Sequence, residues 1–125
     1  MIKEAYCSFE VAKLLKEKGF DEVCHAMYNR NKYLIPTNFP RVTKSEKREF
    51  VLDVPTHQMA LAWLREVHHI FIEISTSIDL NGKYHFSYTI LDKECKYVKL
   101  GCTNFNWKYE DAIEAALEYV LTNLI

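Results

Sequence analysis

An alternation of apolar and polar side chains, with a period of two, runs along both sides of Asn81-Gly82 and restricts the fold more than any other part of the sequence. This period places every second side chain on the same face of a strand, and an Asn-Gly pair favours a tight turn. Residues 70–91 therefore predict an antiparallel hairpin with one apolar face. The apolar set is Ile70, Ile72, Ile74, Ile78, Tyr84, Phe86, Tyr88 and Ile90.

The register of this hairpin follows from parity. A two-residue loop would pair Ile78 with His85 and put the apolar sets of the two strands on opposite faces. A three-residue loop, residues 80–82, pairs Ile78 with Tyr84 and places both sets on one face, with Gly82 in a left-handed bulge position. The polar face then carries the cross-strand pairs Glu73 with Thr89, Ser75 with Ser87 and Ser77 with His85.

Three other segments carry apolar residues at helical spacing. Ser8 and Thr56 stand as N-caps before the first two, and the third begins near Tyr109. Gly19 ends the first helix, because glycine adopts the left-handed conformation after a helix without strain. Further strands are predicted at 22–28, 32–35, 50–54 and 96–103.

These elements predict an α+β fold and one domain over residues 1–125. The expected order is α-β-β, a loop, then α-β-β-β-α, and the short connections favour an antiparallel sheet with the helices packed on one face. The second helix is apolar around most of its girth, which is typical of a central core helix or of an oligomer contact.

The net charge of −1 is the sum of two opposed regions. Residues 29–50 hold six basic and two acidic side chains, whereas residues 109–125 hold four acidic side chains and no basic one. The segment 36–48 contains two prolines and most of these basic residues, so it predicts a loop within the domain. Its basic side chains form one candidate interaction surface: Arg41, Lys44, Lys47 and Arg48.

The order α-β-β-β-α from Thr56 onward is that of double-stranded-RNA-binding domains, which hold phosphate with lysines at the start of the last helix. Here that position carries Glu110 and Asp111, which repel phosphate. Nucleic acid is therefore an unfavoured partner. Weak nucleic-acid binding through the basic loop is kept as the alternative function.

No spacing of cysteine and histidine predicts a cofactor or metal, and none is expected. His57, His68, His69 and Glu73 lack the H-E-x-x-H spacing, and Cys95 with Cys102 lacks a C-x-x-C pair. An enzyme that uses cysteine and histidine is the least favoured class. It would need Cys7, Cys95 or Cys102 to meet a distant histidine in the fold.

The first six residues include an acid and lack the apolar core of a secretory signal, which favours a cytoplasmic protein with no membrane contact. Phe105, Trp107 and Tyr109 stand together before the last helix and form a candidate exposed aromatic patch. Such a patch is typical of a surface that binds another protein.

Three stretches together carry a resemblance: SFEVAKLLKEKGF from Ser8, PTHQMALAWLREV from Pro55 and YEDAIEAAL from Tyr109. The chain resembles a group of small uncharacterised proteins of bacterial genomes and integrated phages. The resemblance implies a phage or mobile-element context and brings no catalytic residues. We therefore expect a small non-enzymatic accessory protein that binds a protein partner or associates with itself as a homodimer.

Overall fold

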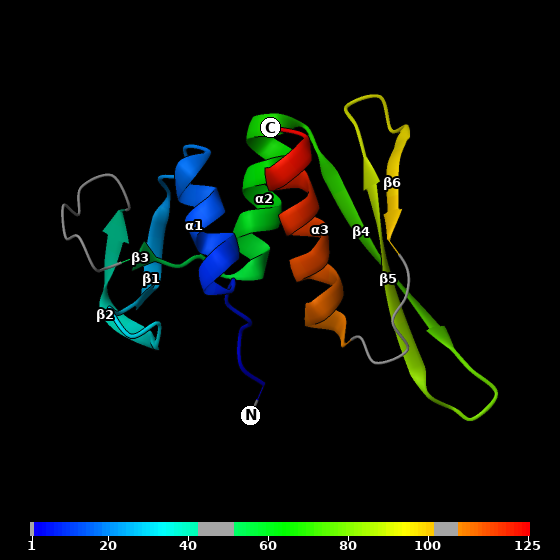
Figure 1. Ribbon diagram of the computed structural model, residues 1–125, viewed down its shortest axis with the longest axis horizontal. Helices are drawn as coiled ribbons and strands as arrows, with labels where there is room; N and C mark the ends of the chain where they lie inside the picture. The colour runs from blue at the N-terminus through cyan, green and yellow to red at the C-terminus, as the bar shows by residue number, and fades with distance from the viewer. Residues whose placement is uncertain (1, 43–51, 102–107) are drawn as a thin grey trace.

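A computed structural model describes residues 2–42, 52–101 and 108–125. Three helices stand in the middle, and a three-stranded antiparallel sheet flanks them on either side (Figure 1). The expected α+β class, single domain and element order are confirmed. The elements are α1 (Phe9–Glu17), β1 (Val23–Tyr28), β2 (Leu34–Val42), β3 (Leu52–Asp53), α2 (His57–His68), β4 (Phe71–Ile78), β5 (Tyr84–Leu91), β6 (Tyr97–Gly101) and α3 (Tyr109–Asn123).

The strands form two sheets, with orders β2-β1-β3 and β4-β5-β6, where the sequence predicts a single sheet. The reason is the path of α2, which follows β3 directly and leads into β4. Its side chains Ala60, Trp63 and Leu64 are buried, so this helix crosses the core and carries the chain from one sheet to the other. None of the described helices combines the length and the apolar character needed to cross a bilayer.

The pairing of β4 with β5 confirms the predicted register. Ile78 pairs with Tyr84 and Ile72 pairs with Ile90, so the apolar side chains of both strands share one face. The polar pairs Glu73 with Thr89, Ser75 with Ser87 and Ser77 with His85 lie on the other face. Gly82 has a φ of 80°, the left-handed conformation that the three-residue loop requires.

Three hairpins of the chain close with the same turn. Each begins with an Asn or Asp whose Oδ1 accepts hydrogen bonds from the backbone amides two and four residues later, at 2.9 to 3.0 Å. These residues are Asn29, Asp79 and Asp92. The fourth residue of each turn has a positive φ: 63° at Lys32, 80° at Gly82 and 59° at Cys95. Only the turn that contains Gly82 has a glycine at this position, and glycine adopts a positive φ without strain.

This difference predicts opposite effects of two substitutions. Gly82→Ala should lower the free energy of unfolding by about 1 kcal/mol, because a left-handed non-glycine residue costs about 1–2 kcal/mol. Cys95→Gly should leave the free energy of unfolding unchanged or raise it by a few tenths of a kcal/mol. The relief of backbone strain in the folded state outweighs the added conformational freedom of the unfolded chain. Urea unfolding of both variants checks this. Shifts of both midpoints in the same direction would contradict it.

Strand β2 continues to Val42, whereas the sequence predicts a loop from Pro36 onward. Prolines fit here because β2 is an edge strand, where a missing backbone N–H is tolerated. Ala26 pairs with Pro36 and Cys24 pairs with Arg41, so β2 contains extra residues that form a bulge between Pro36 and Arg41. Residues 43–48 of the predicted loop lie outside the described residues.

The core lies between the helices and the inner faces of the sheets. The predicted caps are confirmed, since the side chain of Ser8 accepts from the amide of Val11 and that of Thr56 accepts from the amide of Met59. Most of the apolar face predicted for α3 is buried, and its last member, Leu124 at the C-cap, is half-buried. The buried members are Ala112, Ile113, Ala116, Leu117, Val120 and Leu121.

Candidate functional site

The beginnings of α1 and α2 are held together by backbone hydrogen bonds between residues 5–7 and 55–57. The amide of Cys7 donates to the carbonyl of Pro55 at 3.1 Å, and the amide of His57 donates to the carbonyl of Ala5 at 2.9 Å. Cys7 directly precedes the N-cap of α1, and His57 directly follows the N-cap of α2. Two side chains 50 positions apart in the sequence are therefore neighbours.

Glu114 of α3 completes a group that we call the Cys-His-Glu cluster: Cys7, His57 and Glu114. The Oε1 atom of Glu114 lies 2.7 Å from Nε2 of His57 and accepts a hydrogen bond from the amide of Ser8 at 2.9 Å. One potential ligand atom from each member lies within 4.8 Å of the other two. Three helices thus meet at one carboxylate.

Burial and hydrogen bonding set the protonation of the cluster. Burial alone would raise the pKa of Glu114, but its hydrogen bonds with His57 and Ser8 outweigh burial and hold that pKa below the ordinary value. Burial, and then the nearby Glu114 carboxylate, raise the pKa of the Cys7 thiol far above its usual range. At neutral pH the cluster therefore holds an ionised carboxylate next to a protonated thiol.

One nitrogen of the cluster has no hydrogen-bond partner among the described residues. The His57 side chain is 4% exposed, and its Nδ1 atom is buried without a partner. Most buried polar atoms of native proteins are paired, because a lost partner leaves the cost of desolvation uncompensated. The unpaired Nδ1 therefore points to a missing partner.

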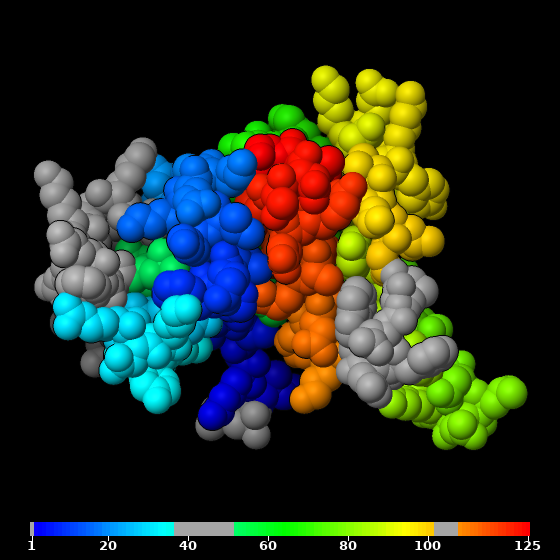
Figure 2. Space-filling view, viewed as in Figure 1, coloured from blue at the N-terminus to red at the C-terminus, as the bar shows by residue number. Residues whose placement is uncertain are grey.

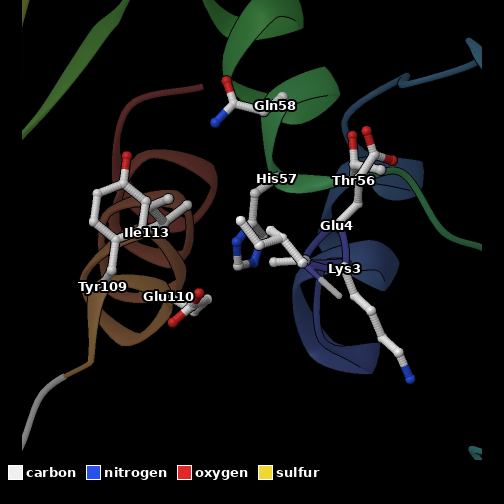
Figure 3. Close-up of a pocket in the computed structure, with 10 residues that line it drawn as sticks. Lys3, Glu4, Thr56, His57, Gln58, Tyr109, Glu110 and Ile113 are labelled. Carbon is white, nitrogen blue, oxygen red and sulfur yellow. The ribbon is translucent and has the colours of Figure 1, made fainter.

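A hollow of about 350 Å³ adjoins His57. Figure 3 shows the imidazole of His57 between the N-terminal segment, with Lys3 and Glu4, and α3, with Tyr109 and Glu110. Two acidic side chains and one basic side chain thus line the hollow, and this balance favours cations over anions.

The cluster is poorly arranged for nucleophilic catalysis. Cys7 is fully buried, and its Sγ lies 3.9 Å from the carbonyl oxygen of Thr56, whereas the imidazole of His57 is bonded to Glu114. A cysteine nucleophile needs an accessible thiolate, and this thiol is buried and protonated. The structure does place Cys7 near a histidine that is distant in the sequence, His57. A cysteine enzyme would require such a pair.

Among the described residues, the metal ligands that the sequence suggested do not come together, and only His57 joins a cluster, with different partners. The ring of His68 packs on Trp63 at 4.7 Å between centroids, and His69 caps α2 in the left-handed conformation. Glu73 lies exposed on β4. The sequence named Cys7 only as a candidate nucleophile, and it did not mark Glu114 as a member of a site. The available signal was that Cys7 and His57 each adjoin a predicted N-cap.

The predicted interaction residues lie mostly beyond the part of the chain that the structure describes. Arg41 is in β2, where its backbone pairs with Cys24. Lys44, Lys47, Arg48, Phe105 and Trp107 lie outside the described residues, and so does Cys102. Weak nucleic-acid binding through the basic residues stays a prediction.

A second candidate surface is the end of the β4-β5 hairpin. Its apolar face packs on α3 as far as Phe86, whose ring meets that of Tyr109, the first residue of α3, at 5.8 Å between centroids. The last pair on this face, Ile78 and Tyr84, is 60% and 61% exposed, and Leu80 in the turn is fully exposed. Figures 1 and 2 show the hairpin extending past the helices. We call this surface the hairpin face: Ile78, Leu80, Tyr84 and Phe86.

No model of a protein family, no curated protein and no solved structure matches the chain.

Proposed function

We propose that the protein is a non-enzymatic accessory protein that binds another protein through the hairpin face. One observation carries the proposal: the apolar face that packs on α3 continues beyond the start of that helix. Exposed apolar side chains gathered on one face of a hairpin favour protein binding, because their burial removes apolar surface from water.

The position of Tyr109 supports this choice of surface. Tyr109 belongs to the aromatic patch predicted from the sequence, is 41% exposed and contacts Phe86 of the hairpin face. The partner that fits such a surface presents apolar side chains of its own. A second copy of this chain is the simplest case, and we propose a homodimer formed through this face. The proposed setting is the cytoplasm of a cell that carries the phage or mobile element implied by the resemblance.

A matched pair of substitutions tests this function. Ile78→Glu places a charge on the hairpin face, whereas Ser77→Glu places the same charge one residue away, on the polar face of the same strand. We expect the wild type and Ser77→Glu to sediment as dimers at micromolar concentration and Ile78→Glu as a monomer. Both variants should keep the circular dichroism of the wild type, because both positions are exposed.

A monomeric wild type would contradict the homodimer. Binding to a different protein is then tested by capture from host lysate with all three proteins as bait. A protein retained by the wild type and Ser77→Glu but lost from Ile78→Glu supports the hairpin face. Equal retention by all three proteins would contradict it.

A further inference from the structure

We propose that the Cys-His-Glu cluster binds a divalent transition-metal ion of the zinc type, at a site separate from the hairpin face. The three side chains offer one sulfur, one nitrogen and one oxygen donor, and all three donors lie within 4.8 Å of one another. Thiolate, imidazole and carboxylate are the donors that zinc takes in proteins. Among the described residues this is the one group of three or more such side chains.

Metal binding would replace one hydrogen bond of the cluster. Nε2 of His57 and Oε1 of Glu114, which lie 2.7 Å apart, would both become ligands of the ion, and Nδ1 would carry the ring proton. The amide of Ser8 also donates to Oε1, and the Ser8 side chain is a further hydrogen-bond partner of this carboxylate, so Ser8 would hold Glu114 in place as a ligand.

The distances require only a small contraction. A tetrahedral ion with metal–nitrogen bonds of about 2.0 Å and a metal–sulfur bond of about 2.3 Å holds its donors about 3.3 to 3.6 Å apart. Donors within 4.8 Å of one another reach that spacing through side-chain movements of about 1 Å. The distance between Nε2 of His57 and Oε1 of Glu114, which is 2.7 Å, would lengthen slightly.

Binding changes the protonation of one group. As the sulfur–metal bond forms, the Cys7 thiol loses its proton to solvent, so one proton is released for each ion bound. The product holds one thiolate and one carboxylate against a divalent cation, and the buried site is neutral overall. Neutrality favours the complex because a net charge at a buried site is costly.

Cobalt is the probe, because a cobalt–thiolate bond gives a charge-transfer absorption band that oxygen and nitrogen ligands do not give. Co²⁺ is added to the reduced, folded protein and, separately, during refolding from denaturant, so that slow entry into the site cannot hide binding. We expect a band that saturates at one equivalent and disappears when Zn²⁺ is added. Cys24→Ser, which alters the other fully buried cysteine of the described residues, should retain the band.

Cys7→Ser should abolish the band, and Glu114→Gln should weaken cobalt affinity by about 10-fold or more. Glu114→Gln keeps the thiol and so tests the site even if Cys7→Ser fails to fold. A band of unchanged size in Cys7→Ser would arise from other cysteines and would overturn the proposal. Absence of the band from the wild type under both conditions, or unchanged affinity in Glu114→Gln, would also overturn it.

Discussion

Gly101→Ala should lower the free energy of unfolding by about 2–3 kcal/mol, at the upper end of the usual cost of overpacking. Gly101 pairs with Tyr88 on the central strand of its sheet, and a Cβ atom at Gly101 would overlap the ring of Tyr88. Tyr88 is buried and packs in the core, so the ring cannot move aside freely. Urea unfolding measures the loss.

A double-mutant cycle identifies the cause of this loss. In a Tyr88→Ala background the overlapping ring is absent, so Gly101→Ala should cost less than about 0.5 kcal/mol, and the two substitutions should be strongly non-additive. Equal costs of Gly101→Ala in both backgrounds would show that the ring is not responsible.

The second large effect is expected at Glu114. Glu114→Ala should lower the free energy of unfolding by about 2–3 kcal/mol, because hydrogen bonds to a charged group contribute about 1.5–3 kcal/mol. The substitution leaves the amide of Ser8 and the ring of His57 without their shared acceptor. Glu114→Gln is the matched control for charge, since it keeps the shape and one acceptor, and it should cost less. A chelator keeps both measurements free of metal.

The effect of Glu114 should depend on pH. Its pKa is lower in the folded protein than the ordinary value of 4.5, so the ionised carboxylate stabilises the folded state. This contribution is complete above pH 4.5 and disappears as the pH falls through the lower, folded-state pKa. The stability difference between the wild type and Glu114→Gln should therefore be largest near neutral pH and shrink in acid. A difference that stays constant with pH would contradict this assignment.

The features that the sequence predicts well depend on neighbours in the chain. The register of β4 and β5 follows from alternation and the position of Gly82, and the helix caps follow from Ser8 and Thr56. These signals are local because the residues that carry them interact within a few positions of one another. The apolar face of α3 was predictable for the same reason.

The features that could not be predicted depend on tertiary contacts. The Cys-His-Glu cluster forms because residues 5–7 pair with residues 55–57 and because α3 packs beside α1. Nothing in the spacing of Cys7, His57 and Glu114 encodes those contacts. The division into two sheets depends likewise on where α2 passes, and the length of β2 depends on its place at a sheet edge.

The meeting of three helices at one carboxylate also matters for a chain that is made from its N-terminus on a ribosome. Ser8 and His57 are synthesised 106 and 57 residues before Glu114. The hairpin turns close within five residues and can form as each emerges. The hydrogen bonds of Ser8 and His57 with Glu114, at the starts of α1 and α2, cannot form until residue 114 has left the exit tunnel. Helix α1 is therefore made before α3, yet it is among the last of the described elements to reach its full set of hydrogen bonds.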